Sequence, residues 1–338
     1  MKRKAHGAQE PKHIPAQYVK VTSTAQRSDS PEQAFNPHFL RYGVIGTGAI
    51  GGFYGGMLAS AGRDVHFLLR SDYECVRENG LRIDSVRGVF RLPTVNAYAA
   101  ADAMPLCDVI LVCVKTTENK DLPNLLRPLL RSGSVVLLLQ NGLGVEQDLA
   151  AQLPEAEIAG GLAFICSQKT GPGHIRHLDY GRLDIGSYNV KNIAILEKVL
   201  DDLRAAEVPA EFSEDLKFAR WRKLVWNVPF NGLTVVMNTT TDRLVAHDSM
   251  RHLVHEIMLE VIHGANRCGV GLKESLAQNM IDMTLKMIPY APSMKLDYDN
   301  RRPMEIEYIY SRTIETAARA GFYMPKTAML ENQLRFKS

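Results

Sequence analysis

Three polar side chains in the second half of the chain recur at intervals of four residues. Lys223, Asn227 and Asn231 stand at positions i, i+4 and i+8, so a helix presents an ammonium and two amides on one face. Apolar residues surround them, including both tryptophans, Trp221 and Trp226. Such a stripe suits the wall of an enclosed cleft, with a solvent-exposed polar face as the alternative. A lysine desolvated in this way has its pKa lowered towards neutrality and is a plausible proton donor.

A glycine-rich turn in the first half has the spacing of a dinucleotide-binding motif. It reads G-T-G-A-I-G and consists of Gly46, Thr47, Gly48, Ala49, Ile50 and Gly51. The turn follows a short apolar stretch and opens a helical pattern, which is the context in which G-x-G-x-x-G binds a dinucleotide. Gly46 permits the tight turn, Gly48 lets the backbone approach a pyrophosphate, and Gly51 lets helix and strand pack closely. The helix N-terminus supplies N–H donors to the phosphates.

An arginine at the end of the second predicted strand bears on which dinucleotide binds. Enzymes that use NAD usually carry Asp or Glu at this point, where the carboxylate accepts the ribose hydroxyls. Arg70 stands there instead, and a guanidinium forms paired hydrogen bonds to a 2′-phosphate. The sequence therefore favours NADP and NADPH over NAD. An exposed arginine at a strand end, with Asp72 nearby, is the alternative.

Two further polar residues end predicted strands at the same edge of the sheet. Lys115 closes the third strand, and Asn141 ends the fourth within Gln140-Asn141-Gly142-Leu143-Gly144. Ligands of this fold sit at the carboxyl ends of the strands, so both side chains are candidates to contact the dinucleotide, and Asn141 to contact substrate as well. A solvated lysine and a turn asparagine are equally good interpretations of the spacing alone.

The elements that must position these residues alternate between strand and helix in the first part of the chain. Apolar runs predict strands over 42–46, 64–69, 108–114, 135–140, 158–165, 174–178 and 182–185, with helices over 50–61 and 119–130. Buried strands separated by helical crossovers predict an α/β fold with a parallel, doubly wound sheet of Rossmann type.

After about Ser213 the pattern changes to long amphipathic helices. They are expected over 214–237, 250–268, 273–287 and 305–320, with a polar loop over 290–303. The sequence thus predicts an NADP-binding domain over 40–212, an all-helical substrate-binding domain over 213–335, and a cleft between them. Residues 1–39 are polar and lack apolar periodicity, so we expect a disordered extension.

Composition narrows the class of protein. The net charge of +3 and the 23% of charged residues give no reason to expect a nucleic-acid partner. No run approaches the roughly 20 apolar residues that span a bilayer. The five cysteines lack Cys-x-x-Cys spacing and are expected to be buried, reduced thiols of a cytoplasmic protein; they are Cys75, Cys107, Cys113, Cys166 and Cys268.

The remaining histidines and methionines give weaker patterns. No Asp, His or Cys set completes a metal site around the helical histidines, so core or surface positions are expected for His252, His255 and His263. Core filling is the expected role of Met280, Met283 and Met287.

Taken in order, these motifs resemble the ketopantoate reductase (2-dehydropantoate 2-reductase) family, within the wider 6-phosphogluconate dehydrogenase-like group. The resemblance covers about residues 42–335. It rests on five segments: G-T-G-A-I-G at 46–51, N-G-L-G at 141–144, W-R-K-L at 221–224 with the two asparagines of the stripe, P-S-M at 292–294, and E-I-E-Y-I at 305–309. It implies NADPH-dependent reduction of the 2-keto group of ketopantoate to (R)-pantoate, on the route to pantothenate and coenzyme A.

The resemblance also implies roles for single residues. Lys223 matches the general acid, and Glu305 matches a glutamate that contacts the substrate hydroxyl and helps orient the lysine. Substrate contacts are implied for Asn227, Asn231 and Ser293, 2′-phosphate contacts for Arg70 and Lys115, and a place at the nicotinamide end for Asn141. The oligomeric state is left open, a homodimer included.

Two positions depart from the family pattern. Glu118 replaces a glutamine of some members, and because a carboxylate beside a phosphate is unfavourable we expect Glu118 to point away. Tyr290 matches an asparagine that holds the substrate in some members, which leaves another branched 2-keto acid, or oxidation of a 2-hydroxy acid, as the alternative reaction. A protein that senses NADPH without chemistry is a further alternative, although it needs neither Lys223 nor Glu305.

Overall fold

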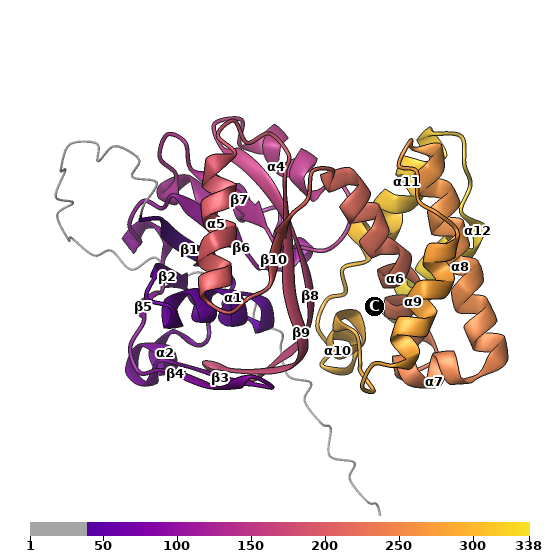
Figure 1. Ribbon diagram of the computed structural model, residues 1–338, viewed down its shortest axis with the longest axis horizontal. Coiled ribbons are helices and arrows are strands. Elements are labelled where there is room, and N and C mark those ends of the chain that lie inside the picture. The colour runs from indigo at the N-terminus through magenta and orange to yellow at the C-terminus, as the bar shows by residue number, and fades with distance from the viewer. Residues whose placement is uncertain (1–38) are drawn as a thin grey trace, which may run out of the picture.

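A computed structural model describes residues 39–338 as two halves that lie side by side (Figure 1). The sheet half, indigo to red in the figure, ends with strand β10. The helical half begins with helix α6, drawn in red, and runs through orange to yellow. Apart from the exposed Phe39, the extension predicted over 1–39 lies outside the described residues. Within residues 39–338, no helix combines the length and the apolar character that crossing a membrane requires.

In the described part of the chain, ten strands form one mixed sheet in the order β4-β3-β9-β8-β7-β6-β1-β2-β5, with β10 paired to β9. Their bounds are β1 (Arg41–Ile45), β2 (Asp64–Leu68), β3 (Leu81–Ser85), β4 (Gly88–Leu92), β5 (Asn96–Tyr98), β6 (Val109–Val112), β7 (Val135–Leu138), β8 (Glu157–Gly171), β9 (His174–Ser187) and β10 (Ala210–Phe212). The central run β8-β7-β6-β1-β2-β5 is parallel, which confirms the Rossmann-type sheet. The pairs β3–β4 and β8–β9 are antiparallel, so the sheet is mixed rather than parallel throughout.

Alternate residues of the central strands enter different cores, as the two-residue period of a strand requires. Tyr42 and Val44 of β1 pack under α1 and α5, whereas Ile45 packs on the other face with α3 and α4. Val135 and Val136 of β7 divide in the same way. Both faces of the sheet are thus covered, and the apolar runs of these strands reflect burial on both sides.

The strands β8 and β9 form a long antiparallel hairpin that extends past the end of β7, and its turn end pairs with β3 (Figure 1). The two strands predicted over 174–178 and 182–185 are one strand, β9. Gly181 has a φ of +106° and stands at an irregularity in the register, where Phe164 pairs with Arg182 and Ile165 with Tyr180. This bulge breaks the sequence pattern without ending the strand.

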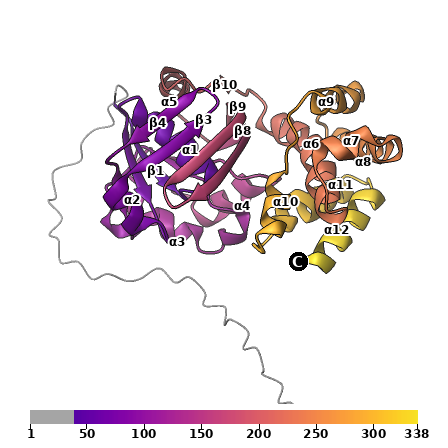
Figure 2. The ribbon, with the colours of Figure 1, turned by 90° about the horizontal axis from the view of Figure 1, so that it is seen from below.

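Five α-helices belong to the sheet half and seven to the helical half among the described residues. The first set is α1 (Ala49–Ser60), α2 (Tyr73–Asn79), α3 (Leu122–Leu126), α4 (Val145–Gln152) and α5 (Ala194–Ala205); the second is α6 (Leu216–Val236), α7 (Thr241–Ala246), α8 (Asp248–Arg267), α9 (Ser275–Leu285), α10 (Ser293–Asp299), α11 (Arg312–Arg319) and α12 (Pro325–Lys337). Short 3₁₀ turns are η1 (Ala101–Ala103), η2 (Thr116–Glu118) and η3 (Arg127–Leu129), and η4 (Glu307–Ser311) is a π-helical turn. Figure 2 shows α3 and α4 lying away from α5, across the strands.

Helix α6 is the central element of the helical half. The side chain of Asp215 caps it by accepting a hydrogen bond of 2.8 Å from the Phe218 N–H, which satisfies a free donor of the first turn. Its apolar residues share one core with those of α8, α9 and α12. Every regular element after Phe212 is helical, which confirms the all-helical second half.

Three details of the helical half differ from expectation. Helix α10 lies within the predicted polar loop 290–303, because Met294 and Leu296 interrupt the polar sequence and Met294 is buried. The helix predicted over 305–320 begins with η4, and Glu305 precedes it. The single helix expected over 119–130 is α3 flanked by two 3₁₀ turns, because Pro123 and Pro128 lack the N–H that a continuous helix requires.

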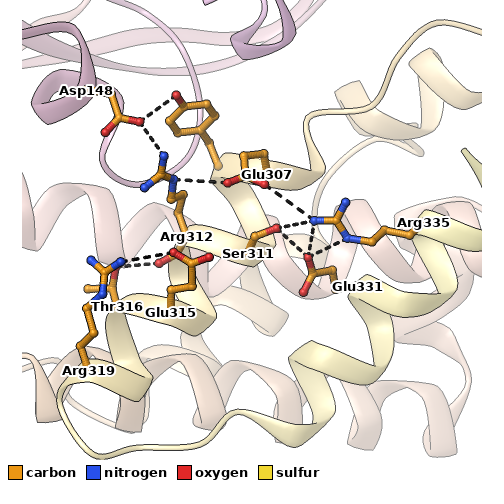
Figure 3. A network of polar contacts seen from close by, with 10 residues as sticks. Asp148, Glu307, Ser311, Arg312, Glu315, Thr316, Arg319, Glu331 and Arg335 are labelled. Carbon is orange, nitrogen blue, oxygen red and sulfur yellow. Dashed lines mark hydrogen bonds and ion pairs between the residues drawn. The ribbon is translucent and has the colours of Figure 1, made fainter. Parts of the chain in front are cut away.

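Polar contacts join the two halves beside the cleft. Asp148 of α4 accepts hydrogen bonds of 2.9 Å from the Tyr308 hydroxyl and from the Arg312 guanidinium. Figure 3 shows Arg312 between Asp148 and Glu307, and a second arginine, Arg335, on the far side of Glu307. The network connects α4 of the sheet half to η4, α11 and α12 of the helical half.

Candidate active site

A cleft of about 1040 Å³ lies between the two halves. Its walls come from the carboxyl ends of the strands on one side and from α6, α9 and α10 on the other. All of the predicted site residues except Gly51 line it: Gly46, Gly48, Ala49, Ile50, Arg70, Lys115, Asn141, Lys223, Asn227, Asn231, Ser293 and Glu305.

The three motif glycines have three different geometries. Gly46 has a φ of +93°, and a Cβ there would lie 2.6 Å from the Val114 nitrogen. A Cβ at Gly51 would lie 2.3 Å from the carbonyl oxygen of Gly46, so Gly51 serves packing rather than the cleft surface. A Cβ at Gly48 would meet no protein atom within 4 Å, and it would occupy cleft space directly before α1. Helix α1 has no acidic residue in its first turn and no side-chain cap, so its free N–H groups suit a pyrophosphate.

Arg70 lies two residues beyond β2 and pairs with Glu118 of η2. Arg70 Nη1 lies 3.1 Å from Glu118 Oε2, and both side chains are about 40% exposed on the cleft, at 42% and 41%. The expectation that Glu118 points away is therefore wrong. With opposite charges at hydrogen-bonding distance, the carboxylate approaches the arginine that was expected to contact a phosphate.

Lys115 follows β6 and forms an ion pair with Asp297 of α10. Asp297 is buried and also accepts a hydrogen bond of 3.1 Å from Arg302 Nε. Lys115 is thus not a fully solvated lysine. Its ammonium joins the end of a central strand to the helical half, across the cleft that both residues line.

Asn141 belongs to a tight loop held by its neighbours. Gly142 has a φ of +102°, and a Cβ there would lie 2.5 Å from the Tyr308 carbonyl oxygen. That oxygen accepts a hydrogen bond of 2.9 Å from the Leu143 N–H. The Gln140 side chain donates to the Val114 carbonyl oxygen at 2.9 Å. Contacts with both halves therefore hold the loop that carries Asn141 to the cleft.

Lys223 points from α6 toward the hairpin of the sheet half. Its Nζ donates a 2.8 Å hydrogen bond to the Ala163 carbonyl oxygen of β8 and lies 5.5 Å from the centroid of the Phe164 ring. Burial of the ammonium, together with the charge of Arg220 one turn earlier, lowers the pKa of Lys223 to about 7, while Glu305 and Asp184 oppose the shift. The group is poised to hold or release a proton near neutral pH.

Glu305 is buried at the junction of the two halves. Its Oε1 accepts hydrogen bonds of 3.0 Å from both the N–H and the hydroxyl of Thr116, at the start of η2. Burial raises the pKa of Glu305, and the bonds from Thr116 act in the opposite direction. With 7% of its surface exposed, Glu305 is not a solvated surface acid.

The amide stripe and α10 form the far wall of the cleft. Asn227 and Asn231 are buried, and Asn231 Oδ1 accepts a 3.2 Å hydrogen bond from the Met294 N–H. Ser293, the first residue of α10, is exposed on the cleft. The half-buried Tyr290 lines the cleft too, and its carbonyl oxygen accepts a 3.1 Å hydrogen bond from the Thr241 hydroxyl. An exposed polar face is thus the wrong alternative for the stripe.

The methionines and cysteines were expected to be buried, and the structure confirms this for some of them. Met280 is buried, as expected, but Met283 is 55% exposed on the cleft, so α9 gives the cleft an apolar wall in addition to filling the core. All five cysteines are free thiols. Cys107 and Cys166 are buried, and the other three are half-buried.

Sequence reasoning missed four groups that hold the site together. They are the Thr116 backbone and hydroxyl, the Ala163 carbonyl, Asp297 and Arg220. Each acts on a residue far away in the chain, and two act through backbone atoms that carry no residue-type signal. Of these groups, only Thr116 could have been suspected from the sequence, because it follows Lys115 at a strand end.

Comparison with known proteins identifies the family. The model described as "Ketopantoate reductase PanE/ApbA" matches residues 42–190, and the model "Ketopantoate reductase PanE/ApbA C terminal" matches residues 215–338. The chain belongs to the ketopantoate reductase family. A 2-dehydropantoate 2-reductase of Nostoc sp. is 47% identical over 301 residues, which cover 88% of this chain and 94% of that protein.

Solved structures of the family share the architecture. The 2-dehydropantoate 2-reductase of Geobacter metallireducens superposes with a TM-score of 0.86 at 41% identity, covering 88% of this chain and 100% of that one. The enzyme of Methylococcus capsulatus has a TM-score of 0.80 at 33% identity, covering 88% and 96%. A D-mandelate dehydrogenase in complex with NADH, at 20% identity and a TM-score of 0.81, shares the fold.

Proposed function

We propose that the chain catalyses the NADPH-dependent reduction of ketopantoate to (R)-pantoate, on the route to pantothenate, with Lys223 as the general acid. The observation that carries the proposal is the ammonium of Lys223, whose pKa is lowered to about 7 in a cleft that also contains the dinucleotide turn. Family membership and the similarity to 2-dehydropantoate 2-reductases support the substrate.

The geometry supports different roles for the two sides of the cleft, with the cofactor bound by the sheet half. Gly48 and the N-terminus of α1 receive the pyrophosphate, and Arg70 reads the 2′-phosphate. When bound, the reduced nicotinamide supplies the hydride. Asn141, fixed by its loop, stands at the nicotinamide end. The cradle at Gly48 fits a dinucleotide because only a residue without a Cβ leaves this space empty.

Lys223 acts on the oxygen of the 2-keto group. As hydride reaches the carbonyl carbon, negative charge grows on this oxygen, and the ammonium stabilises it and donates a proton. The lysine is then neutral and regains a proton from solvent. The Ala163 carbonyl oxygen orients the ammonium during this step, because it accepts one of its three N–H bonds.

The helical half holds the substrate. Ser293 and the α6 amides offer donors to the carboxylate, and Glu305 offers an acceptor to the substrate hydroxyl. Because Asn231 already accepts from the Met294 N–H, it fixes α10 and Ser293 as well. We propose that residues 40–212 form the cofactor-binding domain and 213–335 the substrate-binding domain, which the separate hydrophobic clusters support.

A steady-state assay with ketopantoate, comparing NADPH with NADH, tests the proposal. We expect turnover with NADPH and a lower kcat/KM with NADH. Reduction of another branched 2-keto acid is the second candidate, because Tyr290 and the exposed Met283 give the substrate side an apolar character. If simple branched 2-keto acids match ketopantoate in kcat/KM, this second candidate replaces the first.

A further inference from the structure

The ion pair between Arg70 and Glu118 stands where a dinucleotide of this fold presents its adenosine ribose. Ile45 at the end of β1 pairs with Leu68 of β2 on one side and with Val112 of β6 on the other. Arg70 follows β2 and Glu118 follows β6, so the two side chains come from strands that flank the glycine turn. The end of β2 is the point at which Rossmann folds read the ribose.

We propose that Glu118 sets the balance between NADPH and NADH by competing with the 2′-phosphate for Arg70. The inference rests on the proposed function, because it concerns the cofactor of the same site. It makes Glu118 a specificity-determining residue that lowers the preference for NADPH below what Arg70 alone provides.

The competition follows from the chemistry of the two acceptors. A carboxylate and a phosphate are both anionic acceptors that a guanidinium binds through paired hydrogen bonds. Arg70 Nη1 already lies 3.1 Å from Glu118 Oε2, so a bound 2′-phosphate either displaces the carboxylate or lies beside it. Both outcomes weaken NADPH binding, through the lost ion pair or through repulsion between anions.

NADH binding does not require Glu118 to release Arg70. Without a 2′-phosphate the ion pair persists, and the carboxylate remains an acceptor for a ribose hydroxyl, the task that Asp or Glu performs at this point in NAD enzymes. Glu118 therefore penalises NADPH and spares NADH. The ion pair is about 40% exposed, so its effect on affinity is expected to be a factor of several rather than several orders of magnitude.

Direct binding measurements test this inference without turnover. The dissociation constants of NADPH and NADH are measured by calorimetry for the full chain and for Glu118→Gln, which keeps the side-chain shape and removes the charge. We expect Glu118→Gln to bind NADPH about five-fold more tightly and NADH within about two-fold of the unaltered chain. Adenosine 2′-monophosphate, a fragment that carries the 2′-phosphate, is measured in the same way. We expect its dissociation constant to change as that of NADPH does.

Glu155→Gln is the matched control. Glu155 also forms an exposed ion pair with an arginine of the sheet half, Arg127, at 3.5 Å, but neither residue lines the cleft. Both dissociation constants are expected to stay unchanged in this variant. A five-fold gain for NADPH in Glu155→Gln as well overturns the inference, because the effect is then not local to the cleft.

Salt separates an electrostatic cause from a steric one. In about 1 M salt the screening length falls to about 3 Å, so the advantage of Glu118→Gln is expected to shrink. An unchanged NADPH affinity in Glu118→Gln, or a gain that persists in high salt, overturns the inference. A chain that binds both dinucleotides with the expected ratio but does not reduce ketopantoate refutes the proposed substrate and leaves this inference standing.

Discussion

Arg220 of α6 and Glu146 of α4 form a buried ion pair across the junction of the two halves, with Arg220 Nε 2.9 Å from Glu146 Oε1. The same guanidinium donates to the Gln140 carbonyl oxygen at 2.5 Å, directly before Asn141. Lys223 follows one turn later on α6. The pair therefore fixes α6, which carries the proposed proton donor, against the loop that carries Asn141.

Removing the carboxylate should destabilise the fold strongly. Glu146→Ala leaves Arg220 buried with its charge uncompensated, which costs about 3–5 kcal/mol of unfolding free energy. Urea unfolding measures the loss. In the control Asp201→Ala, which removes an exposed acid paired with Arg204, the change should stay within about 0.5 kcal/mol. Equal stability of the two variants would show that the buried pair contributes nothing.

The lysine on α6 should control the chemical step. Lys223→Ala is expected to lower kcat by about 100-fold or more, the usual scale for a lost general acid, while the dissociation constant of NADPH changes little. Lys217→Ala, at an exposed lysine of the same helix outside the cleft, is the control and should retain kcat. Unchanged turnover in Lys223→Ala removes this residue from the mechanism.

The pKa of about 7 at Lys223 gives the pH dependence a sign. Reduction needs the protonated lysine, which predominates below pH 7, so kcat for reduction should fall as pH rises through about 7. Oxidation of the hydroxy acid needs the neutral amine and should rise over the same interval. A pH profile of kcat in both directions checks this. A reduction rate that stays flat from pH 6 to about pH 9 contradicts the lowered pKa.

Arg70 should discriminate between the two cofactors. Arg70→Ala is expected to weaken NADPH binding by about 10- to 100-fold, because hydrogen bonds to a charged phosphate are lost, and to leave NADH nearly unchanged. Fluorescence titration of both dinucleotides measures the effect. Arg91→Ala, at an exposed arginine of β4 outside the cleft, is the control. Equal losses for NADPH and NADH would mean that Arg70 does not read the phosphate.

Substitution of two glycines of the same turn should affect different properties, namely cofactor binding at Gly48 and stability at Gly46. Gly48→Ala adds a Cβ only to empty cleft space, so thermal stability should hold while NADPH binds at least about ten-fold more weakly. Gly46→Ala places a Cβ against the Val114 backbone at a φ of +93°, so it should lose about 1–3 kcal/mol or more of stability. Thermal melts with and without NADPH separate the two effects. Similar melts for both variants would contradict the geometry of the turn.

The strands that the sequence predicts best are the central ones. Strands β6 and β7 are buried on both faces, so each is a continuous apolar run that stands out from its surroundings. Strands β3 and β4 were missed because they are half-exposed and alternate with charged residues. Helix α10 was missed because its sequence is largely polar, and two of its three buried residues, Lys295 and Asp297, are charged.

The sequence indicated which residues take part in the candidate site, but it did not indicate which other residues they contact. The residue type and spacing of Gly46, Arg70 and Lys223 were enough to suggest what each of them does. The Thr116–Glu305 contact joins residues 189 positions apart, and no local pattern encodes such a distance. The Arg70–Glu118 pair shows the same limit, because the approach of two side chains depends on strand order rather than on either residue.

The anchors of the two proposed catalytic groups have a consequence for how this enzyme tolerates change. Lys223 is held by a main-chain carbonyl at Ala163, and Glu305 in part by a main-chain N–H at Thr116. A main-chain carbonyl persists through any substitution, and a main-chain N–H through any substitution except proline. Substitutions at position 163 therefore leave the support of Lys223 in place. An inserted or deleted residue in β8, by contrast, points the carbonyl at this place to the opposite edge of the strand, because successive carbonyls alternate in direction within the plane of the sheet. Natural variation along this hairpin should therefore appear as substitutions, with its length held constant.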